Sequence, residues 1–358
     1  MRAQLVDGAD LAAALDEWEA LYAADPLATP FQSAGWARAW LADWAPEAEP
    51  YVLLVHDGDR VAGLMALAIR RRGPLRLLGI LGQEPGDYWD VLAAPADRAA
   101  VRAAATAELA RRRGEWDAGI LNCLVPGSTT DASLATAGLR MLTRAPVRCP
   151  AIALPATFDE YLRELPTKRR TDIRRHLRRL DEGELQLIEI GAPDDLPAAL
   201  DRWQDLHTRQ WDERDGDLNP THRTERFRAF LLHAVQALAP SGQALVWDFR
   251  VAGETAGMYV NFADERSLYC YLGGFDPAHT QLGIGKIATA IGIRQSIEHG
   301  RQRYDFTRGA EAYKYWWGAT DRHSPSLVVG SGRPRSRAVL AAAAIVNARR
   351  ERASRAMS

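Results

Sequence analysis

Two stretches of the chain alternate apolar and polar residues in the way that a pair of antiparallel strands does. Residues 51–70 (YVLLVHDGDRVAGLMALAIR) are divided by Asp57-Gly58, a dipeptide that favours a tight hairpin turn. Residues 244–263 (ALVWDFRVAGETAGMYVNFA) show the same pattern around Ala252-Gly253, and their second strands align as RVAGLM and ETAGMY. The pattern predicts one β-hairpin in each half of the chain.

Each hairpin is followed by further strands and then by a helix. In the first half we expect strands at 75–81 and 88–93 before a helix at 96–113; in the second, a strand at 268–273 before a helix at 283–299. The repeated order of elements predicts two tandem α/β domains. Prolines concentrate in residues 146–155 and mark the boundary. We expect domains at 1–150 and 151–330, followed by a basic helix or tail at 331–358.

Composition narrows the class of protein. The chain has 358 residues, of which 47% are hydrophobic and 25% charged, enough for two ordinary cores. A formal net charge of −1 gives no global attraction to nucleic acid or to an anionic membrane, so we expect no stable nucleic-acid partner. Three widely spaced cysteines, Cys123, Cys149 and Cys270, lack the paired spacing of a zinc site. We expect reduced thiols, no metal and a cytoplasmic location.

The chain termini show no membrane signal. The first 26 residues carry acids within their apolar pattern, unlike a signal peptide, and no run approaches the roughly 20 apolar residues of a membrane span. Residues 338–348 (AVLAAAAIVNA) are too short and are followed by arginines, so we expect a terminal helix. A solvated helix face is the favoured interpretation of this tail, and weak contact with a membrane surface is the alternative.

The helix expected at 283–299 opens with two glycines. Gly283 and Gly285 lack side chains at the first turn, where a diphosphate can approach free backbone N–H groups at the positive end of the helix dipole. The glycines of the preceding strand end, Gly273 and Gly274, and the neighbouring Ile284 and Lys286 complete this candidate cofactor site. Close helix–strand packing is the plain alternative for a lone Gly-x-Gly.

Residues 304–318 (YDFTRGAEAYKYWWG) bring several ionisable groups to the end of a strand expected to be buried. They are Asp305, Arg308, Glu311, Tyr313 and Lys314. A buried strand rarely carries so many unless they bind or react with something. We therefore expect the chemistry of the protein to lie near the end of the chain.

These motifs together resemble a known superfamily. The GGFDP strand end at 273–277, the Gly-x-Gly helix start and the strand at 303–307 resemble the acyl-CoA-binding core of the GNAT acyltransferases. The position three residues before the first glycine is Thr280, with Gln281 beside it, where GNAT proteins usually have Arg or Gln. YLGGFDP at 271–277, EHG at 298–300, DFTRGAEAYKYWWG at 305–318, FQSAGWARAW at 31–40 and GDYWDVL at 86–92 resemble the CelD/BcsL branch.

The resemblance implies a fold and an activity. The fold is α/β, with two tandem GNAT-like domains, each a mixed central sheet flanked by helices. The activity is that of an N-acyltransferase that uses acetyl-CoA or another acyl-CoA as co-substrate and a small amine or amino sugar as acceptor. Its chemistry needs a base for the attacking amine, an acid for the leaving thiolate and donors for the oxyanion.

The resemblance also implies roles for residues of the last motif. Glu311 is the preferred general base, and Asp305 is the other candidate unless it pairs structurally with Arg308. Tyr313 stands where many GNAT enzymes place a tyrosine near sulfur and is the candidate acid. Lys314, Arg308 and Tyr271 are expected to bind the acceptor.

Other candidate binding residues each have a structural alternative. The helix after residue 166 has a strongly cationic surface, and its Lys168, Arg170, Arg174 and Arg175 resemble the start of the second domain of FemABX proteins. Arg170 and Arg174 are expected to bind phosphate, against a solvated face as the alternative. His207 is either a packed helix histidine or part of the acceptor site. Asp87 and Asp90 either face a cleft or end a strand.

Two other functions stay open from the sequence. One is FemABX-like aminoacyl transfer from charged tRNA. The other is a noncatalytic ligand-binding protein that keeps the fold. The departure at Thr280 favours both slightly.

Overall fold

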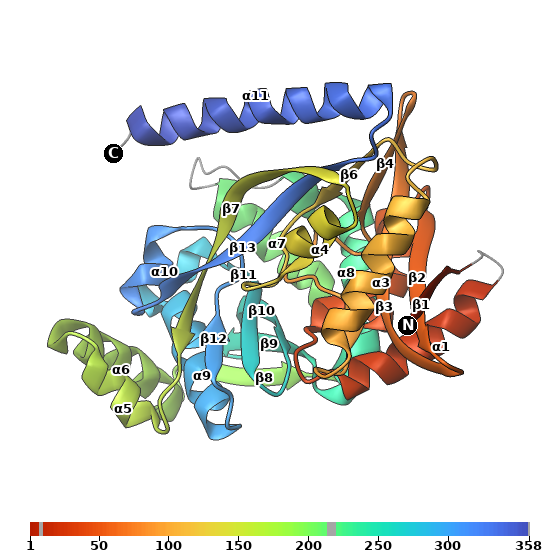
Figure 1. The fold of residues 1–358 in the computed structure, drawn as a ribbon. Coiled ribbons are helices and arrows are strands. Elements are labelled where there is room, and N and C mark those ends of the chain that lie inside the picture. Colours follow the sequence, from red (N-terminus) through yellow and green to blue (C-terminus); the bar gives the residue numbers. More distant parts are fainter. Residues whose placement is uncertain (7–9, 213–219, 357–358) are drawn as a thin grey trace. The chain divides into compact units, whose positions relative to one another are not determined.

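The computed structural model describes residues 1–6, 10–212 and 220–356, and the chain divides into two units (Figure 1). Unit 1 contains residues 1–41, 45–148 and 323–358, and unit 2 contains residues 42–44 and 149–322. Apart from the short segment 42–44, the chain first changes unit after residue 148, two residues before the expected boundary at residue 150. The second change lies inside a strand, well before residue 330.

Unit 1 has helices packed on a mixed sheet. Its strands are β1 (Arg2–Leu5), β2 (Glu49–Asp57), β3 (Arg60–Arg72), β4 (Leu75–Ile80), β5 (Leu92–Ala93), β6 (Ala118–Leu121) and the first part of β7 (Arg140–Ala153). Its helices are α1 (Leu11–Ala24), α2 (Ala34–Ala39), α3 (Arg98–Arg111), α4 (Thr130–Thr136) and α11 (Pro334–Ala356), with a 3₁₀ turn, η2 (Pro30–Gln32). A π-helical turn, η3 (Trp40–Trp44), begins in unit 1, and its residues 42–44 belong to unit 2. The strand order is β1-β2-β3-β4-β6, with β4 and β6 parallel.

Unit 2 repeats this architecture. Its strands are β8 (Gln186–Ile190), β9 (Ala244–Val251), β10 (Glu254–Ala263), β11 (Ser267–Phe275), β12 (Arg303–Asp305) and the first part of β13 (Thr320–Gly330). Its helices are α5 (Phe158–Glu164), α6 (Thr167–Asp181), α7 (Leu196–Asp212), α8 (Glu225–Leu238), α9 (Ile284–Glu298) and α10 (Ala312–Trp316), with 3₁₀ turns η4 (Pro220–Arg223), η5 (Ala239–Ser241) and η6 (Pro277–Leu282). The strand order is β8-β9-β10-β11-β12, with β11 and β12 parallel.

The two expected hairpins are confirmed. Strand β2 pairs with β3 across Asp57 and Arg60, and β9 pairs with β10 across Val251 and Glu254. Ala252 and Gly253 both have positive φ, 50° and 87°, as a tight hairpin turn of this kind requires. The hairpins therefore form where alternation and turn residues coincide.

The two units exchange their last strands. Strand β7 begins in unit 1, but its residues 151–153 pair with β12 in unit 2. Strand β13 begins in unit 2, but its residues 327–330 pair with β6 in unit 1. Each repeat is thus completed by the strand that ends the other repeat.

One expected strand is wrong for most of its length. Of residues 88–93 only Leu92–Ala93 form a strand, because Tyr88 has a φ of 64° and this left-handed conformation interrupts an extended chain. Trp89 instead makes an isolated bridge to Leu124. The aromatic residues here are buried without belonging to a strand.

Helix α9 forms the core of unit 2. Ile284, Ile287, Ala288 and Ile291 share one face of the helix and are all at most 2% exposed. These side chains pack with Trp247 and Tyr304 of the sheet, and the α5–α6 hairpin lies beside α9 (Figure 1). Among the described residues no helix is long and apolar enough to cross a membrane.

Candidate functional site

The parallel strands β11 and β12 pair over a short stretch only. They pair only from Ser267 to Tyr269 on β11, although β11 continues to Phe275 beside β10. The register with β10 slips between Leu272 and Cys270, which leaves Tyr271 as the extra residue of a bulge. Beyond Tyr269, strand β11 therefore extends past its pairing with β12.

Two side chains of helix α7 bind backbone groups of this extension. The Nδ1 of His207 lies 2.8 Å from the carbonyl oxygen of Gly273, and the N–H of Phe275 donates to Oε1 of Gln210 at 3.1 Å. A Cβ on Gly274 would lie 2.7 Å from the backbone nitrogen of His207. Position 274 therefore requires glycine, because α7 packs directly against its backbone.

The glycines at the start of α9 have different surroundings. Gly283 has a φ of 70°, and a Cβ there would lie 2.4 Å from Cε1 of His176. A Cβ on Gly285 would meet only the hydroxyl of Tyr259, at 3.2 Å. The N–H groups of Lys286 and Ile287 already donate to the carbonyl of Gly283. The first-turn N–H groups of Ile284 and Gly285 have no intrahelical acceptor, as at any helix start.

Helix α6 contacts the segment that leads into α9. His176 bonds through Nδ1 to the carbonyl of Leu282 at 3.1 Å, and Arg179 donates to the carbonyl of Gln281 at 2.8 Å. Lys286 forms an ion pair with Asp172. Burial opposes the charge on Asp172, but the bond from Lys286 prevails and lowers its pKa below the usual value. Lys286 and Arg179 are therefore cations that lie next to the start of α9.

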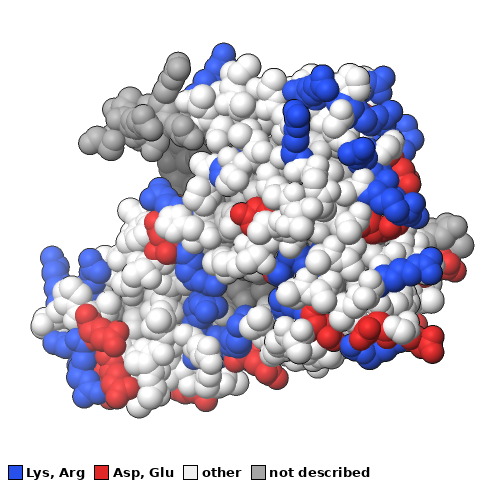
Figure 2. All heavy atoms as spheres, in the orientation of Figure 1, with Lys and Arg blue, Asp and Glu red and all other residues white. Residues whose placement is uncertain are grey.

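The two predicted phosphate-binding arginines are engaged elsewhere on the hairpin. Arg174 is exposed and pairs with Asp159 at 3.3 Å, and Arg170 donates to Oγ1 of Thr167 at 3.1 Å. In the view of Figure 2, Lys and Arg side chains of the α5–α6 hairpin, at lower left, are interspersed with acidic ones. This arrangement is typical of a solvated, internally paired helix surface.

Asp305 ends strand β12 with no exposed surface. Its Oδ1 accepts the N–H of Thr307 at 2.8 Å, and its Oδ2 pairs with Arg322 at 3.3 Å. Thr307 has a φ of 56°, so the chain turns sharply here. The carboxylate therefore fixes the start of the 305–314 turn, which we define as the segment from Asp305 to Lys314.

Lys314 closes the same turn from inside. Its side chain is 3% exposed, and its Nζ lies 2.9 Å and 3.2 Å from the carbonyl oxygens of Arg308 and Gly309 and 2.8 Å from Oε2 of Glu311. An ammonium group has three donors, and these acceptors match all three. Glu311 is 55% exposed and is the N-cap residue of α10.

Tyr313 lies near the thiol of Cys270. The residue is 55% exposed, but its ring packs edge-on against Phe306, and burial, followed by the proximity of Cys270 and Glu311, raises its pKa. Burial also raises the pKa of the Cys270 thiol, while a hydrogen bond with Tyr304 opposes this shift. Both groups therefore stay protonated near neutral pH.

His207 is part of a histidine pair. Its Nε2 lies 3.3 Å from Nδ1 of His222, and its ring stacks on Trp203 at 5.1 Å. Burial lowers the pKa of His222 to about 4, with smaller effects from His207 and Arg308. Burial lowers the pKa of His207 as well, although its bond to Gly273 opposes the shift. Both imidazoles are neutral at pH 7.

The structure thus brings most of the predicted residues into unit 2, around the end of β11, the start of α9 and the 305–314 turn. Tyr271 packs edge-on against Phe262 of β10 at 5.1 Å. Asp87 and Asp90 lie in unit 1, and the side chains of both are buried. Asp90 pairs with Arg102 at 2.8 Å, so that each of these two buried charges has a partner.

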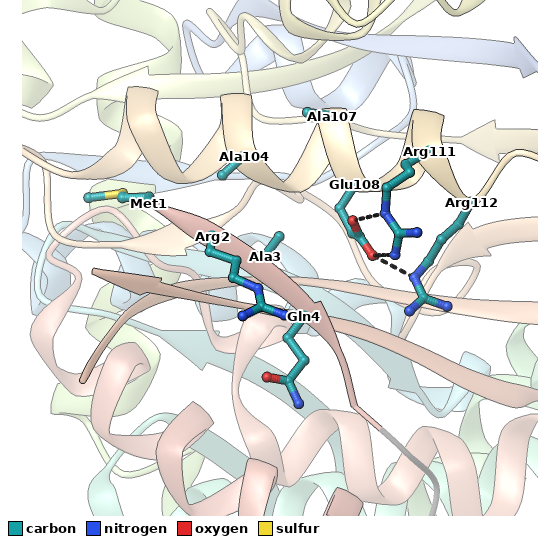
Figure 3. Close-up of a pocket in the computed structure, with 9 residues that line it drawn as sticks. All are labelled: Met1, Arg2, Ala3, Gln4, Ala104, Ala107, Glu108, Arg111 and Arg112. Carbon is teal, nitrogen blue, oxygen red and sulfur yellow. Dashed lines mark hydrogen bonds and ion pairs between the residues drawn. The ribbon is translucent and has the colours of Figure 1, made fainter. Parts of the chain in front are cut away.

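A surface pocket of about 540 Å³ lies in unit 1 between β1 and α3 (Figure 3). Its charged lining residues are Arg2, Glu108, Arg111 and Arg112, and the bond from Arg111 lowers the pKa of Glu108 to about 2. None of the residues predicted from the sequence lines it. Within the described part of the chain, no three His, Cys, Asp or Glu side chains gather as a candidate metal centre.

Sequence reasoning did not single out several residues that shape this site. They are His222, Gln210, Asp172, Arg179 and Arg322. His222 lies 15 residues from its partner and on another element, so no local spacing could have linked them. Arg322 likewise reaches Asp305 from β13.

Comparison with known proteins agrees with this geometry. Residues 167–315 match the family model described as an acetyltransferase (GNAT) domain. No curated protein matches the sequence. The structure of FemX superposes with a TM-score of 0.66 at 13% identity, over 91% of this chain and 97% of that one. L-PGS from Bacillus licheniformis gives 0.55 at 12% identity, over 96% and 98%. At these identities the likeness concerns the fold, which is a mixed α/β fold of the GNAT kind.

Proposed function

We propose that the protein is an N-acyltransferase that transfers an acyl group from acyl-CoA to a small amine or amino sugar. The observation that carries this proposal is the parting of β11 and β12 directly before a helix that starts with Gly-x-Gly. Beyond Tyr269 the edge of β11 is no longer paired with β12, and a thioester arm can lie along it outside the two backbone groups that α7 binds. The first-turn N–H groups of α9, with Lys286 beside them, suit the diphosphate of CoA. The CelD/BcsL branch stays part of the proposal.

The proposed reaction needs few groups. The amine attacks the thioester carbonyl, a base takes its proton, and the thiolate leaves with a proton from an acid. Tyr313 suits the last role, because its hydroxyl is protonated at neutral pH and, by the resemblance, it stands where many GNAT enzymes place a tyrosine near the sulfur of the thioester. A hydroxyl whose pKa is raised is a weak acid, so proton donation has to coincide with cleavage of the carbon–sulfur bond.

Calorimetric titration with acetyl-CoA tests the donor. We expect Gly285→Val to abolish binding, since a branched side chain would block approach to the α9 N–H groups. Gly191→Val is the matched control, because a Cβ at Gly191 meets nothing within 4 Å and its backbone needs no positive φ. Unchanged affinity in Gly285→Val, or no affinity in the parent, contradicts the acyl-CoA assignment.

Aminoacyl-tRNA is the second candidate donor, and one observation favours it. Helix α7 already occupies Gly273 O and Phe275 N, two backbone groups that a pantetheine arm would otherwise bind. Thermal unfolding in the presence of acetyl-CoA, longer acyl-CoAs and alanyl-tRNA separates the donors, because a ligand of the folded state raises its melting temperature. A shift with the tRNA alone would favour the second candidate. No shift with any donor would favour a noncatalytic role.

A further inference from the structure

The hydrogen bonds of the His207–His222 pair determine where its protons lie. A carbonyl oxygen only accepts, so Nδ1 of His207 carries the proton that it donates to Gly273. Neutral His207 then has a lone pair on Nε2. Nε2 of His207 lies 3.3 Å from Nδ1 of His222. Because Nε2 is the acceptor of this hydrogen bond, Nδ1 of His222 must carry the proton. Neutral His222 is therefore left with a lone pair on its own Nε2.

This lone pair lies in a specific part of unit 2. The pair is tied to β11 through Gly273, beyond the point where pairing with β12 ends. Arg308 of the 305–314 turn is close enough to affect the charge of His222. Within the described part of the chain, Nε2 of His222 makes no hydrogen bond. A basic nitrogen thus belongs to a ring that is linked to the extension of β11 through His207 and is near enough to Arg308 to feel its charge.

We propose that Nε2 of His222 accepts the proton of the attacking amine, and that His207 is the positioning residue that fixes its tautomer. This inference rests on the proposed acyl transfer. It gives the base role to a residue other than Glu311, whose carboxylate is engaged with the buried ammonium of Lys314.

The proton and bond changes balance without any further reactant. As the amine nitrogen bonds to the acyl carbon, its proton moves to Nε2 and His222 becomes an imidazolium. Nδ1 keeps its proton and still donates to His207, and a charged donor strengthens that bond. The carbon–sulfur bond then breaks, or the carbon–oxygen bond if the donor is an ester. The leaving atom receives a proton, and His222 returns its own to solvent.

The charged and titratable neighbours define what can perturb this step. For His222 they are His207 and Arg308, and for His207 the neighbour is Arg223; each disfavours a positive charge on the imidazole that it faces. A neutral pair at pH 7 can accept a proton, and positive neighbours help it to release that proton afterwards. The alternative is that the two histidines only pack in the core. Their role would then lie in ring contacts, such as that between His222 and Phe227, whose ring centroids are 4.7 Å apart.

His222→Asn is the sharpest variant. The amide nitrogen of Asn takes the place of Nδ1 and keeps the bond to His207, but the variant has no Nε2. With acetyl-CoA and glucosamine as probes and thiol release as the signal, we expect kcat at pH 7 to fall about 10²–10⁴-fold with little change in KM. Added imidazole should restore part of the rate. His207→Asn should lower kcat less and change the pH profile.

His299→Asn is the matched control, because His299 is exposed and also bonds a carbonyl, that of Gln295 at 2.7 Å, through Nδ1. It should retain full activity. A kcat of His222→Asn within threefold of the parent, or a loss that imidazole does not restore in any part, overturns the base assignment.

Nitrogen-15 NMR of the imidazoles gives a readout that needs no turnover. Both His207 and His222 should be neutral Nδ1–H tautomers at pH 7. An Nε2–H tautomer of either ring overturns the relay even if the enzyme is active. Absence of transfer with acetyl-CoA, longer acyl-CoAs and alanyl-tRNA, with both Nδ1–H tautomers present, overturns the proposed function and with it the catalytic role of His222.

Discussion

At the scale of single residues, the glycines of the site separate packing from ligand approach. A Cβ on Gly274 would lie 2.7 Å from the His207 nitrogen and 2.9 Å from its Cα, both backbone atoms that cannot move alone. We expect Gly274→Ala to lower the free energy of unfolding by about 1–3 kcal/mol. Gly285→Ala, which meets only the Tyr259 hydroxyl, should change it by less than about 1 kcal/mol. Urea unfolding of both variants measures these free energies. Equal stability of Gly274→Ala and Gly285→Ala would mean that α7 can shift to accommodate the methyl group.

Glu311 provides the direct comparison with His222. Glu311→Gln keeps an oxygen to accept a bond from Lys314 but cannot act as a base at neutral pH. If His222 is the base, we expect kcat of this variant to stay within about 10-fold of the parent, since the expected effect of losing a general base is 10²-fold or more. A 10²-fold loss in Glu311→Gln, with an active His222→Asn, would return the role to Glu311 as the sequence predicts.

The histidine pair also makes stability depend on pH. The pKa of folded His222, about 4, lies below the value of about 6.5 expected for the unfolded chain. Its contribution is therefore fully present above pH 6.5 and is lost as the pH falls towards 4. Between pH 7 and pH 5 we expect the free energy of unfolding to drop by about 2 kcal/mol from this group. The drop should be smaller by that amount in His222→Asn; an identical pH dependence would contradict the burial of His222.

The residues of this region that the sequence analysis named differ physically from the contacts that it did not predict. Asp305, Glu311 and Lys314 lie within ten residues of one another, so a single strand end and turn brings them together. Nothing local indicates that the ammonium of Lys314 points inward to bind two carbonyl groups. Such contacts depend on the path of the backbone, which side-chain patterns do not specify.

At the scale of elements, strand β12 depends on one buried carboxylate. Asp305→Asn keeps an oxygen for the Thr307 N–H but removes the charge that faces Arg322. Because Arg322 is 29% exposed, we expect Asp305→Asn to lower the free energy of unfolding by less than the loss of a fully buried pair would. The expected decrease is roughly 2–4 kcal/mol. Asp159→Asn, which breaks an exposed pair with Arg174, should cost less than about 0.5 kcal/mol. Chemical denaturation of the two variants measures the difference, and equal losses would count against a structural role for Asp305.

The elements followed the sequence wherever pattern and turn residues agreed. Both hairpins, helix α3 and helix α9 lie where they were expected, because alternation or a helical stripe is bounded by suitable turns or caps. The segment 88–93 misled because its aromatic and aliphatic residues are buried in a loop, and burial alone does not require a strand. The positive φ of Tyr88 could not be predicted from the sequence, because residues other than glycine rarely adopt it.

At the scale of the whole molecule, the exchange of β7 and β13 could not be predicted. Both strands follow the last helix of their own repeat, and either partner strand would satisfy their apolar residues. Only the pairing of residues 327–330 with β6, and of 151–153 with β12, shows that each repeat is completed by the other's strand. A boundary drawn from prolines therefore says where the chain turns, but not which residues fold together.

This exchange predicts how fragments behave. A fragment of residues 1–150 lacks residues 327–330, so one edge of β6 loses its partner and its apolar side chains are uncovered. We expect this fragment to be unfolded or aggregated at 25 °C. Residues 1–148 joined by a flexible Gly/Ser linker to residues 323–358 should fold cooperatively, because they contain the whole of unit 1, together with residues 42–44. Circular dichroism and thermal unfolding of both fragments provide the measurement. A stable, cooperative 1–150 fragment would show that β6 does not need β13, and that the expected boundary at residue 150 marks an independent domain.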